Sequence, residues 1–67
     1  MKKISISLSG HQTSISLEQE FIDALHEIAQ KEKISVAGLI GKIDATRKLD
    51  NNLSSAIRVW ILNYFRH

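Results

Sequence analysis

The sequence predicts a mainly helical fold with a short β-ribbon near its N-terminal end. Residues 3–8 and 13–17 alternate apolar and polar side chains, which is the period of strands with one buried face. From residue 18 onward the apolar residues recur at helical spacing instead, and the helical pattern is repeated twice more. The predicted order is therefore two strands followed by three helices, at about residues 18–31, 35–47 and 52–66.

The two strand segments, KISISL and TSISL, share the tetrapeptide SISL, in which isoleucine and leucine alternate with serine. The residues between them, SGHQ (9–12), predict a turn, because Gly10 can adopt a positive φ. The two segments could pair with each other as a hairpin. Alternatively, one could pair within the chain and the other across a dimer. In both cases the alternation predicts one apolar face and one serine-rich face.

The first predicted helix begins with acidic residues and carries one apolar stripe. Glu18 and Glu20 suit the positive N-terminal end of a helix dipole. The stripe has the spacing of a helix face that packs on a core. It comprises Phe21, Ile22, Leu25, Ile28 and Ala29.

A capping residue precedes each of the other two helices. Ser35 caps the second helix, in which Gly38 and Gly41 each cost roughly 1 kcal/mol relative to alanine. That cost is tolerable where another element packs closely against them. Asn51 or Asn52 caps the third helix after a polar loop. The apolar stripe of the third helix is broader than one face, which predicts at least two neighbours and therefore an oligomer.

Size and composition favour one domain, residues 1–67, that associates with a second copy. A chain of 67 residues without cysteine buries little of its surface alone and has no disulfide, yet 43% of its residues are hydrophobic. Such a chain usually completes its core with another copy. No apolar run approaches the roughly 18 residues that cross a bilayer, and no long apolar stretch of a signal peptide follows the basic start. We therefore expect a cytoplasmic protein without a membrane partner.

The sequence gives little support to catalytic or metal-binding chemistry. It has no cysteine nucleophile and no glycine-rich phosphate loop, and its acidic residues form a surface run on the first helix. His11, His26 and His67 lack the spacing of metal ligands. We expect a protein that is not an enzyme and that has no cofactor and no metal. The net charge of +2 permits nucleic acid as a partner.

The order of the elements is similar to that of a known family. In TSISLEQEF (13–21) a short strand leads directly into a helix, and in ISVAGLIGKI (34–43) a Ser-capped helix opens. This order resembles the ribbon-helix-helix family of DNA-binding proteins over about residues 11–46. GHQTSISLEQEF followed by NLSSAIRV also resembles a small bacterial subfamily with a C-terminal third helix. The resemblance implies a homodimer, or a tetramer, whose ribbon contains one strand from each subunit and enters double-stranded DNA.

The resemblance also implies roles for individual residues. Gln12, Ser14 and Ser16 match the groove-facing positions of the ribbon, where they would contact bases. The start of the second helix would hold a DNA phosphate with backbone N–H groups. The implied phosphate contacts are Ser35, Val36, Lys33 and His11. The implied dimer core comprises Ile15, Leu17, Phe21, Leu25, Leu39, Ile40, Ile43 and Trp60.

Two features depart from the family pattern, and the assignment of the second helix has an alternative. Many family strands carry Arg or Lys on the groove face, whereas residues 12–16 carry none. If the additional strand, 3–8, pairs beside the second strand, a dimer has a four-stranded sheet, which fits the groove less easily. Finally, NLSSAIRVWILNYF (52–65) itself resembles the second helix of the family. On that alternative, residues 35–47 would be an inserted helix.

We therefore expect a dimeric, sequence-specific transcriptional regulator, of the repressor type, that inserts a β-ribbon in the major groove. The alternative is a protein-interaction or assembly module, or an antitoxin-like protein. Such a protein would bind its partner through the broad apolar face of the third helix. The mild net charge and the absence of Arg and Lys from residues 12–16 favour this alternative.

Overall fold

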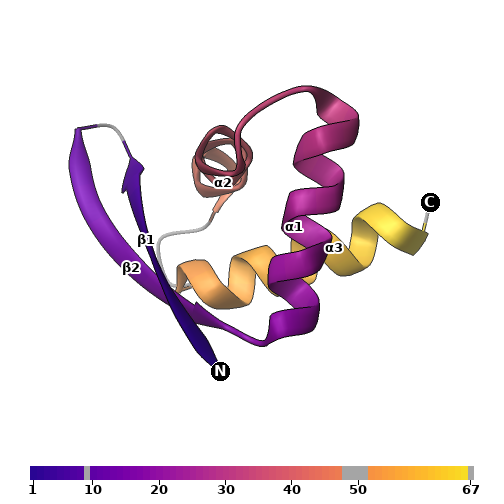
Figure 1. The fold of residues 1–67 in the computed structure, drawn as a ribbon, viewed down its shortest axis with the longest axis horizontal. Coiled ribbons are helices and arrows are strands. Elements are labelled where there is room, and N and C mark those ends of the chain that lie inside the picture. Colours follow the sequence, from indigo (N-terminus) through magenta and orange to yellow (C-terminus); the bar gives the residue numbers. More distant parts are fainter. Residues whose placement is uncertain (9, 48–51, 67) are drawn as a thin grey trace.

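A computed structural model describes residues 1–8, 10–47 and 52–66 of the chain. Two strands, β1 (Lys2–Leu8) and β2 (His11–Leu17), precede three helices, α1 (Gln19–Glu32), α2 (Val36–Thr46) and α3 (Leu53–Arg66). Figure 1 shows the hairpin at one side of the three helices. This order confirms the predicted fold class, and each helix boundary lies within one residue of its predicted position.

The two strands pair with each other as an antiparallel hairpin, which is one of the two pairings that the sequence left open. Because Leu8 pairs with His11, only two residues remain in the loop. The predicted four-residue turn was therefore too long, and His11 and Gln12 belong to β2. Gly10 has φ +81°, which fits the positive φ that two-residue hairpin loops require.

The end of α1 and the start of α3 are closed by local hydrogen bonds. At the end of α1, Lys33 adopts a left-handed conformation with φ 59°, and the Ile34 N–H donates to the Ala29 carbonyl at 3.0 Å. This is the hydrogen bond that closes a Schellman-type helix end. The Asn52 side-chain oxygen accepts the Ser55 N–H at 2.8 Å and so caps α3, as predicted. The alternative cap, Asn51, and the rest of the predicted polar loop lie outside the described residues.

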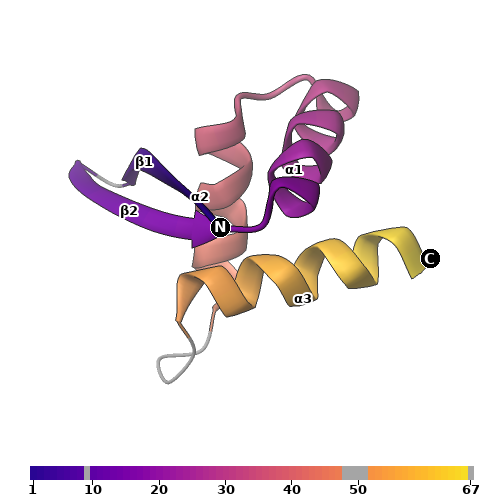
Figure 2. The ribbon, with the colours of Figure 1, turned by 60° about the horizontal axis from the view of Figure 1, so that its bottom comes forward.

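The core lies where all three helices and the hairpin meet. β1 lies against α2, and β2 lies against α3, while each helix contacts the other two. Figure 2 shows α3 running across the ends of α1 and α2, with the hairpin beside α2. The third helix is thus an integral part of the fold. The buried apolar residues among those described are Ile15, Leu17, Ile22, Leu25, Ile28, Ala29, Leu39, Ile40, Ile43, Ile57 and Ile61.

The two glycines of α2 have different surroundings. A Cβ added at Gly41 would lie 3.8 Å from the Leu8 Cδ2 atom, which is ordinary van der Waals contact. The hairpin therefore packs closely on α2 at this position. Such close packing is the condition under which a glycine within this helix was expected to be tolerated. A Cβ added at Gly38 would instead lie 3.1 Å from the Ser35 hydroxyl, which is a crowded position.

Candidate nucleic-acid interface

The hairpin has an apolar face toward the helices and a polar face on its outer side. In β2, Ile15 and Leu17 are buried, whereas Gln12 and Ser14 are exposed and Ser16 is half-buried. Strand alternation places these three polar residues on the face opposite the core. The sequence-predicted base-contacting residues therefore share one accessible surface.

The first strand adds three more polar residues to the same surface. Cross-strand partners lie on the same face of a sheet, and the register pairs a β1 residue with each polar β2 residue. We call the resulting set the outer face. Its pairs are Lys3 with Ser16, Ser5 with Ser14, and Ser7 with Gln12.

The three β1 residues of the outer face were not among the predicted contacts, and Lys3 is the charged one of them. The groove-facing positions of β2 alone carry no cation, but the register places exposed Lys3 beside Ser16. The pairing of Lys3 with Ser16 could have been predicted from two features of the sequence. One is the alternation of Lys3, Ser5 and Ser7 along β1, and the other is a loop of two residues between the strands. A four-residue turn does not give this register, so the error in the turn concealed the pairing.

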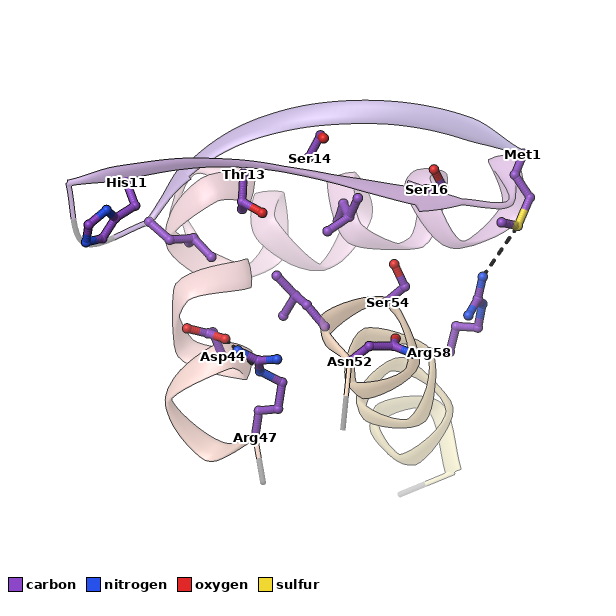
Figure 3. A pocket seen from close by; sticks show the side chains of 13 residues that line it. Met1, His11, Thr13, Ser14, Ser16, Asp44, Arg47, Asn52, Ser54 and Arg58 are labelled. Carbon is purple, nitrogen blue, oxygen red and sulfur yellow. Dashed lines mark hydrogen bonds and ion pairs between the residues drawn. The ribbon is translucent and has the colours of Figure 1, made fainter. Parts of the chain in front are cut away.

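A hollow of about 710 Å³ lies along β2, between the hairpin, the end of α2 and the start of α3, and its lining includes Ser14 and Ser16 as well as Thr13. Figure 3 shows Thr13 pointing from β2 toward the helices, whereas Ser14 points the other way. Thr13 therefore points to the same side as the buried Ile15 and Leu17, but its side chain remains exposed. Asn52 and Ser54 from the start of α3 also line the hollow.

The start of α2 lies apart from this hollow, since its residues do not line it. The Ser35 hydroxyl accepts the Gly38 N–H at 2.9 Å, and the Ser35 carbonyl accepts the Leu39 N–H at 2.9 Å. The amides of Val36 and Ala37 precede these two in the first turn. No acidic residue lies in that turn, and exposed Lys33 lies just before it. The local charge therefore suits an anion.

His11 occupies a different place from the other predicted phosphate contacts. It begins β2 beside the loop of the hairpin, pairs with Leu8 and lines the hollow under the ribbon. Its side chain is exposed. His11 thus belongs to the hairpin, whereas Ser35, Val36 and Lys33 lie together at the start of α2.

Two arginines near the hollow have carboxylate partners. The Arg47 Nε donates to Asp44 at 2.9 Å, and the Arg58 Nε donates to Glu18 at 2.9 Å. A hydrogen bond from its own backbone N–H, and then the one from Arg58, lower the pKa of the Glu18 carboxyl. These pairs offset the positive charge of both arginines beside the hollow.

One side of α3 presents apolar side chains to solvent. Val59, Leu62 and Phe65 are 58%, 55% and 50% exposed. Together with Phe21 of α1 they line an apolar hollow of about 310 Å³. Phe65 lies in the last turn of α3, which extends past α1 (Figure 2). We call Phe21, Val59, Leu62 and Phe65 the α3 patch.

The predicted dimer-core residues divide into two groups. Most of them are buried within the single chain: Ile15, Leu17, Leu25, Leu39, Ile40 and Ile43. Phe21 and Trp60 remain half-buried, and the Trp60 ring stacks on Tyr64 with centroids 5.5 Å apart. The chain therefore closes more of its own core than the sequence predicted, and the exposed large apolar residues of the described part of the chain, apart from Met1, lie on α3.

No group of three or more histidines, aspartates and glutamates in residues 1–8, 10–47 and 52–66 is arranged to hold a metal ion. In the same part of the chain, no helix has both the length and the apolar character needed to span a bilayer.

Comparison with known proteins identifies the family. A model of the ribbon-helix-helix domain matches residues 1–65. Members of this family are typically DNA-binding transcription regulators. No curated protein and no solved structure matches the chain significantly. Because the family model covers the hairpin and all three helices, the chain belongs to the ribbon-helix-helix family.

Proposed function

We propose that the protein is a homodimeric, sequence-specific DNA-binding regulator, of the repressor type, that acts on DNA in the bacterial cytoplasm. The observation that carries this proposal is the two-faced hairpin. Its inner face is apolar and packs on the helices, while Gln12, Ser14 and Ser16 lie on the outer face. Membership of a family of DNA-binding regulators supports the same function.

The outer face has the chemistry for base contacts. A two-stranded ribbon fits the major groove of B-DNA, which is about 12 Å wide. Gln12 can pair with the N6 and N7 atoms of adenine through two hydrogen bonds, and Ser14 and Ser16 can bond to several base edges. The two serine side chains are short, so the backbone of the ribbon can approach the bases closely at these positions.

The proposed phosphate contacts lie at the start of α2. The amides of Val36 and Ala37 and the dipole of α2 favour a bound phosphate, with Ser35 holding the first turn in place. Lys33 would add a positive charge beside the same phosphate. His11, at the tip of the hairpin, would contact a separate phosphate. Such contacts position the protein without specifying the sequence.

The accessible surface of the chain supports a dimer. A monomeric protein of 7.6 kDa is expected to expose about 4,300 Å². The chain exposes 4759 Å², and its exposed large apolar side chains include Val59, Leu62 and Phe65. We propose that a second copy covers the α3 patch, which would give the two-fold symmetry that a palindromic operator requires.

A selection from randomised duplex DNA at about 0.1 M salt, where exposed charges are only partly screened, tests the function. We expect an enriched, roughly palindromic motif from the natural sequence. The Gln12→Ala/Ser14→Ala variant should select a more relaxed motif and keep its oligomeric state. Retention of DNA without any enriched sequence would contradict the proposal.

The second candidate function is a protein-interaction or assembly module, including an antitoxin-like protein. The observation that favours it is the α3 patch, which a protein partner other than a second copy could cover. Leu62→Glu tests the choice, because Leu62 is exposed and its replacement leaves the core intact. Sedimentation analysis should show loss of the dimer in this variant, while His26→Glu on the exposed side of α1 should remain dimeric. A Leu62→Glu variant that stays dimeric would favour the second candidate.

A further inference from the structure

One edge of β2 has no pairing partner in the described part of the chain. β1 pairs with the other edge of β2 along its whole length. Four consecutive residues of β2, 13–16, line the hollow of about 710 Å³, and they come from both faces of the strand. The hollow therefore borders the edge that faces away from β1. Within residues 1–8, 10–47 and 52–66, no backbone hydrogen bond joins residues 12–16 to a helix.

The backbone groups at this open edge belong to the outer-face residues of β2. In an antiparallel pair, hydrogen-bonded residues alternate with residues whose N–H and C=O groups point away from the partner strand. The two-residue loop makes Leu8 and His11 a hydrogen-bonded pair. The N–H and C=O groups of Gln12, Ser14 and Ser16 therefore point away from β1. An open strand edge of this kind is a template for pairing with another chain.

These three residues can pair with the same three residues of a second copy. A two-fold interface brings the same surface of both subunits together. An antiparallel copy centred on Ser14 places Ser14 opposite the partner's Ser14, and Gln12 opposite the partner's Ser16, with both outer faces on one side of the sheet. Arg58 lines both the hollow along β2 and the hollow of the α3 patch. The open edge thus adjoins the surface already proposed to meet a second copy.

This pairing would make β1 the outermost strand on each side of a four-stranded sheet. Adjacent strands lie about 4.8 Å apart, so the two central β2 strands fit a groove about 12 Å wide. The two β1 strands would lie about 14 Å apart, which is three strand spacings. They would therefore lie over the two rims of the groove, where DNA presents phosphates rather than base edges.

The outward side chains of β1 suit such a rim. Lys3 is exposed and supplies a cation, and the hydroxyls of exposed Ser5 and Ser7 can donate hydrogen bonds to phosphate oxygens. The two serines are small, so the strand can lie close to the DNA backbone. The inner side of β1 packs against the core, with Leu8 over Gly41 of α2. This packing fixes the direction in which the outward side chains point.

We propose, on the basis of the proposed DNA-binding function, that β1 contacts the DNA phosphates on either side of a ribbon formed by the β2 strands of two subunits. Its contact residues are Lys3, Ser5 and Ser7. β1 strengthens binding to every DNA sequence, whereas Gln12 and Ser14 of β2 discriminate between sequences. The additional strand is compatible with groove insertion because it lies outside the groove.

Cysteine crosslinking of the full chain tests the arrangement of the strands, because the natural sequence has no cysteine. Ser14→Cys should form a disulfide between subunits, since hydrogen-bonded partners on antiparallel strands lie about 5.5 Å apart at Cα, within reach of a disulfide. Ser5→Cys is the matched control. Ser5 is exposed on the same face, but it would lie about 14 Å from its copy. If Ser14→Cys does not crosslink faster than Ser5→Cys, the proposal is overturned.

Two pairs of variants test the role of β1 on DNA. Ser5→Ala/Ser7→Ala and Gln12→Ala/Ser14→Ala are compared in the selection from randomised duplex DNA. Lys3→Ala and Lys2→Ala are compared by their dissociation constants for the selected DNA between about 50 and 200 mM salt. Lys2 is the matched control, because it is exposed and carries the same charge but pairs with Leu17 on the inner face. Thermal melting of each variant checks that the fold is retained.

We expect Ser5→Ala/Ser7→Ala to bind more weakly but to select the natural motif, whereas Gln12→Ala/Ser14→Ala should relax the motif. Lys3→Ala should weaken binding about tenfold. It should also lower the slope of log K against log salt by about 0.9 for each phosphate that the protein no longer neutralises. Lys2→Ala should change both quantities less.

Three results on DNA would contradict the proposal in distinguishable ways. If Ser5→Ala/Ser7→Ala changes the selected motif, β1 contacts bases and the proposed phosphate role is wrong. If the β1 variants bind like the natural sequence while Gln12→Ala/Ser14→Ala relaxes the motif, β1 makes no contact and the DNA-binding function stands. If the natural sequence enriches no motif, the role of β1 and the DNA-binding function both fail.

Discussion

Arg58 of α3 and Glu18, which precedes α1, are joined by a hydrogen-bonded ion pair across forty residues of sequence. The Arg58 Nε lies 2.9 Å from the Glu18 Oε1, and a second guanidinium nitrogen of Arg58 lies 3.5 Å from the Met1 sulfur. The arginine thus connects the third helix to the point where the hairpin leads into the first helix. It links the part of the fold proposed to associate with a second copy to the part proposed to contact DNA.

This ion pair predicts a loss of stability in acid. The pKa of Glu18 in the folded chain lies below its ordinary value of 4.5, because hydrogen bonds from its own backbone N–H and from Arg58 favour the carboxylate. Its contribution is therefore fully present above the pKa of the unfolded chain and is lost as the pH falls through the lower, folded pKa. We expect Glu18→Gln to melt at a lower temperature than the natural sequence at pH 7 and to approach it near pH 3. A difference in melting temperature that is independent of pH would contradict this.

Replacement by alanine is expected to affect stability differently at the two glycines of α2. Gly41→Ala should stabilise the protein by about 1 kcal/mol, because alanine favours the helix and its Cβ meets Leu8 at an ordinary contact distance. Gly38→Ala should gain less or lose stability, since its Cβ would crowd the Ser35 hydroxyl that caps the helix. Urea unfolding of both variants measures the difference. Equal stabilisation by both would show that the cap adjusts freely.

Replacing Lys33 with glycine is expected to raise the free energy of unfolding and to weaken DNA binding. Its left-handed conformation is unfavourable for a residue with a Cβ, so Lys33→Gly should stabilise the fold by roughly 0.5–1 kcal/mol. The same change removes a proposed phosphate contact and should lower DNA affinity. Lys31→Gly is the control, because Lys31 lies within α1 and should lose about 1 kcal/mol as glycine. Urea unfolding and DNA titration follow the two effects separately. DNA affinity that rises with stability in Lys33→Gly would remove Lys33 from the contact surface.

A negative charge added at the start of α2 is expected to lower DNA affinity more than one added at the start of α3. Aspartate caps helices well, so Ser35→Asp and Asn52→Asp should both keep the stability of the fold. At Ser35 the new carboxylate would repel the proposed phosphate. DNA affinity should fall about tenfold or more, because a hydrogen bond to a charged group contributes about 1.5–3 kcal/mol. Asn52→Asp should have a smaller effect. The reverse order would assign the phosphate contact to α3, as expected if residues 52–65 correspond to the second helix of the family.

Strand alternation and helix periodicity were sufficient to predict the elements of this fold and the two faces of the second strand. Ile15 and Leu17 are buried and Ser14 is exposed because a strand turns every second residue to the same side. The caps Ser35 and Asn52 were likewise predictable, since their side chains bond to amides only three residues away.

Features that depend on how distant segments meet were harder to predict. The place of Lys3 beside Ser16 follows from the length of one loop, and a change of two residues in that loop shifts every cross-strand pair. The ion pair between Arg58 and Glu18 requires knowledge of how α3 crosses α1. The extent to which the chain buries its own core also depends on the packing of Ile57 and Ile61 of α3 beneath the other elements, rather than on any local pattern.

The alternation of inner-face and outer-face residues along each strand also affects how the sequence of such a protein can change during evolution. Every outer-face residue is flanked along its strand by residues of the inner face, so a mutation at Ser5 or Ser14 changes the solvent side of the ribbon and leaves the packing of Ile4 and Ile15 untouched. Surface substitutions of this kind usually alter stability by no more than about 0.5 kcal/mol. A ribbon built in this way can acquire a new DNA preference one residue at a time, and every intermediate in that evolutionary path remains folded.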